Sequence, residues 1–198
     1  MVMFKLILFC FTLFSISFSD EIIILDTSKV DTSKLEVLNV EKDLEYIPDV
    51  FLKDLDNKKI SIHDLLDGRP ALISFWFLAC EPCKKEMKYL DEFNKKYADT
   101  GFQVISINTD GSRALSSVEP FVKSKKYSFK VLSDPRSKYQ RKLKGTSCPF
   151  TVMVDHRGVI TARHVGYNAG DEKKLEQEII ELINKANPDT LRLNVKSE

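Results

Sequence analysis

Two cysteines separated by two residues, Cys80 and Cys83, are the side chains in this sequence whose type and spacing most directly predict chemistry. At this spacing the second sulfur can reach the first to form a small disulfide ring, or can resolve a mixed disulfide by intramolecular attack. Pro82 lies between them and limits the freedom of the ring. The pair therefore predicts thiol–disulfide exchange, in which Cys80 attacks, Cys83 resolves, and a Cys80–Cys83 disulfide is the oxidised state.

Two other interpretations of this pair stay open. A C-x-x-C pair can be half of a structural zinc site, but the sequence contains no second C-x-x-C or H-x-x-H to complete four ligands. The pair can also be a purely structural disulfide, although closing so short a loop removes little entropy from the unfolded chain. Both are weaker than the catalytic interpretation.

Of the two further cysteines, Cys10 and Cys148, the second comes directly before Pro149. It has three candidate roles: a small apolar residue beside the dithiol, a third redox thiol, or a third thiolate ligand that joins Cys80 and Cys83 around a soft metal such as Cu(I). The first role is the most common one for an isolated cysteine.

The histidines give a metal site little support. His164 falls on a predicted strand, where a satisfied or solvent-facing role is favoured, and His63 and His156 fall in predicted loops or turns with no evident partner. We therefore expect no bound metal and no cofactor.

A buried strand before Cys80 and an amphipathic helix after it are predicted to position the dithiol. Residues 71–77 form a continuous apolar run, which is typical of a strand covered on both faces. Apolar side chains then recur at helical spacing, with lysines and acids on the other side: Cys83, Met87, Leu90, Phe93 and Tyr97. Pro82 suits the first turn of this helix. Cys80 should therefore lie at a helix N-terminus, where free N–H groups and the helix dipole stabilise a thiolate.

Two acids flank the pair. Glu86 lies three residues after Cys83, on the apolar stripe of the helix, so its carboxyl is expected to lean inward, to have a raised pKa and to exchange protons with Cys83. The alternative is a glutamate at the edge of the helix, paired with a lysine. Glu81 lies between the cysteines and should be exposed, where it tunes cysteine acidity or partner choice.

The rest of the chain alternates strand-like and helix-like segments, as α/β domains do. We expect a hairpin over 51–62 and a buried strand at 102–108. A helix around 118–127 and a short helix starting at Asp134 should follow. Two antiparallel strands are predicted at 150–154 and 159–165, joined by a turn with Gly158, and a final helix at 171–186 is ended by Pro188.

The N-terminal residues 1–19 combine Lys5, an apolar stretch and small residues near Ser19, which is typical of a signal peptide cleaved after Ser19. The stretch is short for a membrane span of ~20 residues, although an uncleaved anchor stays open. Residues 20–45 form an extension of unknown role, and residues 188–198 form a C-terminal tail.

The net charge of +1, with lysines interleaved among acids, argues against nucleic-acid binding.

Residues 75–76 and 80–86, Phe-Trp and Cys-Glu-Pro-Cys-Lys-Lys-Glu, resemble the active-site segment of the TlpA/ResA-like exported thioredoxins. The similarity extends to the segments that lead into the first strands of that family, which correspond to residues 47–51 and 64–70. Residues 148–151 resemble its cis-proline loop. The similarity covers about 46–187. It implies a thioredoxin-like three-layer α/β/α sandwich with a mixed central sheet and an N-terminal β-hairpin.

The resemblance also implies roles for single residues. Pro149 would be cis and would place the backbone of Cys148 opposite the dithiol, where a substrate peptide can pair with it. Trp76, Glu81 and Pro82 would complete the substrate-binding surface, and Glu86 would act near the dithiol. The sequence departs from the family at Ala79, where a tryptophan is usual, and at Cys148, where threonine, valine or isoleucine is usual.

By resemblance, the expected function is an exported thiol–disulfide oxidoreductase, periplasmic or on the outer face of the cytoplasmic membrane. It would act as a monomer that reduces protein disulfides, such as those of apocytochrome c. A membrane thiol–disulfide electron donor would recharge it. Residues 1–19 would tether it to the membrane if that segment is retained. The alternative is a copper carrier that uses the three cysteines. A peroxiredoxin is less favoured, because the residues before Cys80 contain neither the proline nor the threonine of a Pro-x-x-x-Thr-x-x-Cys loop.

Overall fold

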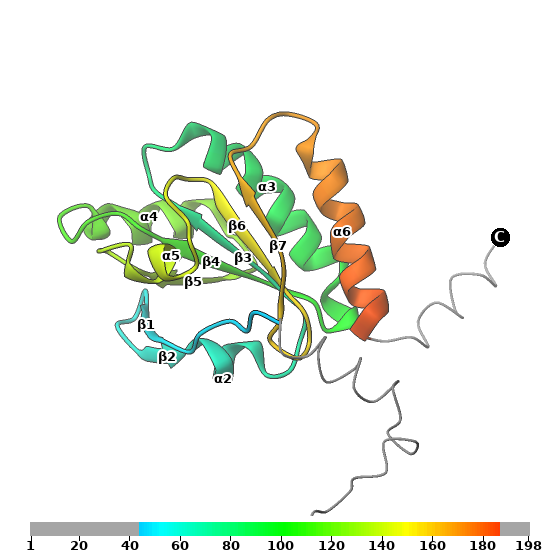
Figure 1. Ribbon diagram of the computed structural model, residues 1–198. Coiled ribbons are helices and arrows are strands. Elements are labelled where there is room, and N and C mark those ends of the chain that lie inside the picture. The colour runs from blue at the N-terminus through cyan, green and yellow to red at the C-terminus, as the bar shows by residue number, and fades with distance from the viewer. Residues whose placement is uncertain (1–43, 187–198) are drawn as a thin grey trace, which may run out of the picture. The chain divides into compact units, whose positions relative to one another are not determined.

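One mixed sheet organises residues 44–186, the part of the chain that the computed structural model describes (Figure 1). Within these residues, seven strands lie in the order β2-β1-β5-β4-β3-β6-β7. The strands are β1 (Phe51–Asp54), β2 (Lys59–Ser61), β3 (Ala71–Trp76), β4 (Gln103–Asn108), β5 (Lys130–Ser133), β6 (Phe150–Val154) and β7 (Ile160–Val165). β3, β4 and β5 are mutually parallel, and the other pairings are antiparallel.

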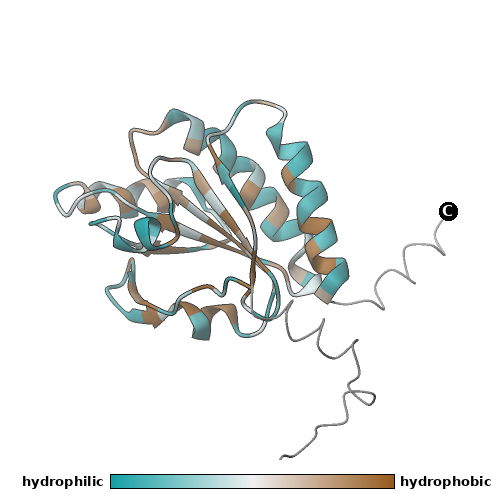
Figure 2. Ribbon diagram, in the orientation of Figure 1, coloured by the Kyte–Doolittle hydropathy of each residue, from teal (hydrophilic) through white to brown (hydrophobic). Residues whose placement is uncertain are grey.

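Helices cover both faces of the sheet. They are α2 (Ile62–Leu66), α3 (Glu81–Lys96), α4 (Leu115–Lys125), α5 (Lys138–Lys142) and α6 (Asp171–Ala186), with a 3-10 turn at Ala98–Thr100. One core cluster joins the sheet to α3, α4 and α6, and a second joins it to α2 and α5. Figure 2 shows the apolar residues concentrated along the strands and on the inner sides of the helices. The expected three-layer α/β/α fold with an N-terminal hairpin is confirmed.

Strand β3 lies between β4 and β6, and all six of its residues are buried. Leu72 and Trp76 belong to the core under α3, whereas Ile73 and Phe75 belong to the opposite core. This alternation requires apolar residues on both faces, which explains the continuous apolar run in the sequence.

Helix α3 begins directly after Cys80 and buries one stripe of residues: Cys83, Glu86, Met87, Leu90 and Phe93. Pro82 occupies its first turn, where a missing N–H costs no helical hydrogen bond. The predicted period of this helix is therefore confirmed, and Tyr97 forms its C-terminal cap.

The short helix expected from Asp134 begins later, at Lys138. The carboxylate of Asp134 accepts hydrogen bonds from the backbone N–H groups of Lys138, Tyr139 and Gln140. Asp134 therefore caps α5 from an upstream turn rather than starting the helix itself, a contact that the local sequence pattern did not distinguish from a first helical residue.

The segments 1–19 and 188–198, and all but the last two residues of 20–45, lie outside the described residues, so their assignments stay predictions. Among the helices of 44–186, none combines the length and the hydropathy that crossing a membrane requires.

Gly145 gives a test of packing behind the site. A Cβ added there would lie 2.4 Å from Cδ1 of Phe150 and 2.9 Å from Cγ of Gln140. Gly145→Ala should lower the free energy of unfolding by about 1–3 kcal/mol, since overpacked cores must shift their neighbours. Urea unfolding measures the change. Gly111→Ala is the matched control, because no atom lies within 4 Å of the added Cβ; equal effects of the two substitutions would contradict the packing argument.

Candidate functional site

The dithiol lies where β3 passes into α3, with Cys80 as the N-cap residue of the helix. The backbone N–H of Cys83 donates to Sγ of Cys80 at 3.2 Å, so this sulfur already occupies the position where a free helical N–H stabilises a thiolate. The structure joins the two cysteines in a disulfide, with their Cα atoms 5.3 Å apart. Cys80 is 5% exposed and Cys83 is fully buried. Cys80 is therefore the more accessible of the two cysteines.

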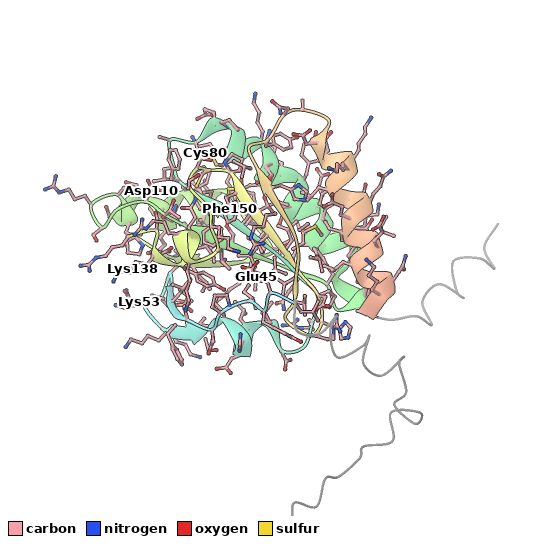
Figure 3. The ribbon with its side chains drawn as sticks, viewed as in Figure 1. Glu45, Lys53, Cys80, Asp110, Lys138 and Phe150 are labelled. Atoms are coloured by element: carbon pink, nitrogen blue, oxygen red, sulfur yellow. A yellow bond between two sulfur atoms is a disulfide. The ribbon has the colours of Figure 1, made fainter. Side chains whose placement is uncertain are left out.

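The loop before Cys80 is held by the end of the neighbouring strand β4. Asp110, which is labelled in Figure 3, accepts a hydrogen bond from the backbone N–H of Leu78 at 2.7 Å and from the Asn108 side chain at 2.8 Å. Thr109 donates to the carbonyl oxygen of Trp76 through both its N–H and its hydroxyl. Asp110 was missed in the sequence; its place after a buried strand parallel to β3 was the signal, because parallel strands end at the same edge of a sheet.

The peptide bond between Cys148 and Pro149 is cis, as expected. Phe150, the next residue, pairs with Phe75 in the antiparallel register of β6 and β3. This register carries Cys148 and Pro149 past the level of Phe75, toward the end of β3 that leads to Cys80.

Cys148 itself is a half-buried free thiol. Its Sγ lies 3.4 Å from Nε2 of Gln140 and 3.9 Å from the hydroxyl of Thr109. Burial raises the pKa of the Cys148 thiol above its usual value, and these two hydrogen bonds oppose that rise only in part. The side chain is therefore held as a neutral thiol beside the site.

An open groove of about 370 Å³ lies between the loop that follows β3 and the cis-proline loop. Phe77, Thr109, Gln140 and Cys148 contribute to its walls, and Phe77 is 36% exposed. Ala79 is exposed and small, so no bulky side chain at this position flanks Cys80. The groove therefore runs along the free thiol of Cys148 and the loop that leads to Cys80.

Glu86 is buried, with 3% exposure, as its place on the helical stripe predicted. Its carboxylate accepts hydrogen bonds from the hydroxyls of Ser74 and Thr151, each at 3.2 Å. Ser74 and Thr151 are paired across β3 and β6, so the sheet presents both hydroxyls to one carboxylate. Burial raises the pKa of Glu86 to about 7, against the effect of these hydroxyls. The alternative of a lysine-paired edge glutamate is therefore wrong.

A second pocket, of about 320 Å³, reaches Glu86 from the side of β7 and α6. His164, Tyr167 and Asp171 also line it. Because the rest of the Glu86 side chain is enclosed, this pocket gives the carboxyl a way to exchange protons with solvent.

Trp76 does not form part of the substrate surface. Its side chain has no exposed area, its ring centroid lies 5.6 Å from that of Phe121, and its Nε1 has no hydrogen-bond partner among the described residues. We therefore assign Trp76 to the core beneath the site. Pro82 and Glu81 are exposed at the start of α3, and Glu81 pairs with Lys84 at 2.7 Å.

Nothing in the described residues favours a metal site: within 44–186, no three or more His, Cys, Asp and Glu side chains gather closely enough to hold an ion. His164 lies 2.6 Å from a carboxylate oxygen of Glu178. His63, expected to have no partner, instead lies in α2 with its Nε2 2.9 Å from the carbonyl oxygen of Ile47. His156 lies in the turn between β6 and β7.

Glu86 generates a prediction about stability. Because its pKa is raised in the folded protein from 4.5 to about 7, the folded state binds this proton more tightly than the unfolded state does. The contribution of Glu86 to stability is therefore fully present below pH 4.5 and is lost as the pH rises through about 7. Glu86→Gln keeps polar partners for both hydroxyls without a charge, so it should be more stable than the wild type at pH 8, by up to about 3 kcal/mol.

Urea unfolding of the oxidised proteins at pH 4 and pH 8 measures this difference. Glu92→Gln, on the exposed side of the same helix, is the control and should show no such dependence. A stability difference between Glu86→Gln and the wild type that does not grow with pH would contradict the assigned burial effect.

Three comparisons with known proteins agree with this geometry. The sequence pattern of the Redoxin family matches residues 42–179. The thioredoxin-like protein YneN of Bacillus subtilis is 32% identical over 133 residues, which cover 67% of this chain and 75% of that protein. The thiol-disulfide oxidoreductase ResA of Bacillus cereus is 30% identical over 119 residues, which cover 60% of this chain and 67% of ResA.

Among solved structures, a protein from Chlorobium tepidum that is provisionally assigned as the thiol:disulfide interchange protein DsbE is 25% identical. The similarity has a TM-score of 0.66 and covers 71% of this chain and 96% of that one.

Proposed function

Because this chain belongs to the Redoxin family and is a thioredoxin-like thiol–disulfide oxidoreductase, we propose that Cys80 and Cys83 are the dithiol that carries its reaction. The observation that supports this most directly is the place of Cys80 Sγ at the N-terminus of α3, where it accepts the N–H of Cys83. The same contact stabilises a negative charge on Cys80 when the disulfide is reduced.

In the reduced protein, the Cys80 thiolate attacks one sulfur of a substrate disulfide. The substrate S–S bond breaks, a Cys80–substrate disulfide forms, and the other substrate sulfur leaves as a thiolate that takes a proton from solvent. Cys83 then loses its proton and attacks Sγ of Cys80, which releases the second substrate thiolate. Two electrons pass to the substrate, and the Cys80–Cys83 disulfide remains.

Glu86 is the proposed acceptor of the Cys83 proton. It follows Cys83 by one turn on the same buried face of α3. A carboxyl whose pKa is about 7 populates both protonation states near neutral pH, which suits a group that takes up and returns a proton. The pocket on the side of β7 and α6 supplies the exchange with solvent.

The groove beside the cis-proline loop is the proposed substrate site. An extended peptide can pair with the backbone of Cys148 while Pro149 withholds an N–H, and Pro82 and Glu81 border the peptide on the α3 side. Of the three candidate roles for Cys148, the half-buried neutral thiol favours that of a small apolar residue beside the site.

We further propose that the protein acts outside the cytoplasm as a monomeric reductant of protein disulfides, such as those of apocytochrome c. A membrane thiol–disulfide donor would restore the dithiol. The similarity to ResA and to a DsbE-like protein supports this placement, together with the signal-like residues 1–19, which would export the chain or tether it. The copper-carrier alternative has no comparable support in the geometry of residues 44–186.

Replacing the resolving cysteine tests the order of attack. Cys83→Ser should accumulate mixed disulfides with protein substrates, because the adduct on Cys80 has no neighbour to release it. Non-reducing electrophoresis and mass spectrometry of the trapped adducts measure this. Cys80→Ser is the matched variant and should trap none; the opposite pattern would reverse the two roles.

The direction of the reaction is tested by the reduction potential of the pair. A reductant should lie near the ~−270 mV of thioredoxin rather than the ~−120 mV of DsbA. Equilibration with dithiothreitol or glutathione buffers, followed by thiol labelling, gives the value. The measurement is made on Cys148→Ser as well as on the wild type, so that only the pair titrates. A value close to that of DsbA would make the protein an oxidant.

A further inference from the structure

A separate groove, of about 710 Å³, begins at Glu81, the residue directly after Cys80. Its walls come from the exposed side of α3, from α4 and from the segment that follows α4. The lining residues are Lys84, Lys85, Lys88, Lys95 and Lys125, the acids Glu81, Asp91 and Glu92, and the aromatic residues Phe121 and Tyr127. We call this surface the lysine groove.

The charges of the lysine groove do not cancel. Glu81 is paired with Lys84, and Asp91 is paired with Lys95. The other three lysines, Lys85, Lys88 and Lys125, have no ion pair within the described part of the chain, and there Glu92 is the one lining acid without a pair. The groove therefore carries excess positive charge on a protein whose net charge is only +1.

Phe121 fixes part of this charge in place. Its ring centroid lies 5.8 Å from Nζ of Lys84 on α3 and 5.8 Å from Nζ of Lys125 on α4. An aromatic face attracts an ammonium group without neutralising it, so the unpaired charge of Lys125 stays over the groove, beside the Lys84–Glu81 pair. The same ring packs on Trp76, the last residue of β3. The charged surface is thus built onto the strand that leads to Cys80.

The position of the groove indicates what it binds. A protein disulfide that reacts with Cys80 can place the residues on one side of its own cysteine beside Glu81, and each extended residue advances by about 3.3 Å. Acidic residues a few positions from that cysteine would then lie near Lys85, Lys88 and Lys125. The acids Glu81, Asp91 and Glu92 make the surface a poorer fit for a continuous polyanion such as nucleic acid or an anionic membrane.

We propose that the lysine groove selects protein disulfides that carry acidic residues beside the reacting cysteine. This inference rests on the proposed dithiol reaction and names the class of substrate that the reaction prefers. Charge of opposite sign near the dithiol raises the rate of encounter and orients the partner, with an effect that salt screens.

The test uses two disulfide peptides that differ only in acidic or basic flanks, together with the neutral hydroxyethyl disulfide. For each protein, kcat/KM for each peptide is divided by the rate with the neutral disulfide, so any general loss of folding or chemistry cancels. The wild type should prefer the acidic peptide, and the preference should fade at about 1 M salt, where charges are screened beyond about 3 Å.

The groove variant Lys85→Glu/Lys88→Glu/Lys125→Glu should lower the acidic-to-basic ratio by about tenfold or more. The matched control Lys53→Glu/Lys58→Glu/Lys59→Glu makes the same change in net charge on the β1–β2 hairpin, which Figure 3 places away from Cys80 at Lys53. Equal ratios in the two variants would overturn the proposal. The milder Lys85→Gln/Lys88→Gln/Lys125→Gln variant should give a smaller change in the same direction.

Two further outcomes separate the alternatives. The groove variant, but not the hairpin control, could lose binding to phosphatidylglycerol vesicles while its acidic-to-basic peptide ratio stays unchanged. This result would overturn the proposal and would indicate a membrane-facing surface. If the wild type does not reduce the neutral disulfide, the result contradicts the proposed dithiol reaction itself. A wild type that reduces the neutral disulfide but shows no preference between the peptides refutes the groove proposal alone.

Discussion

In the centre of the sheet, β3 pairs antiparallel with β6, and this one register assembles the site from two distant parts of the chain. Ser74 lies opposite Thr151, so two hydroxyls meet the carboxylate of Glu86. Phe75 lies opposite Phe150, so the cis-proline loop continues past the end of β3, where the Cys80 loop starts. A shift of one residue would send every side chain of β6 to the other face of the sheet and would separate these groups.

Much of this arrangement could be predicted, because it follows from local patterns. The continuous apolar run predicts the buried strand β3, and the apolar residues at helical spacing predict α3. Together they place Cys80 between the end of a strand and the start of a helix. The inward lean of Glu86 follows from the same stripe. The cis geometry of Pro149 came from family resemblance, since an X-Pro pair alone seldom predicts it.

The rest depends on contacts between residues far apart in sequence. Trp76 borders the dithiol in the sequence, yet its ring turns into the core against Phe121 of α4, a partner that no local pattern identifies. Asp110 holds the loop before Cys80 from the end of another strand. Such contacts can be predicted only when the order of the strands is known, because they join residues that are adjacent in the sheet but distant in the sequence.

The half-buried thiol of Cys148 has a consequence for the durability of the protein. Oxidation by peroxide and exchange with foreign disulfides both proceed through thiolate, and burial keeps the thiolate fraction of Cys148 low. A third sulfur can therefore remain beside a reactive pair without scrambling it or linking two chains together. Burial of its thiol thus lets a free cysteine persist beside a redox-active cysteine pair.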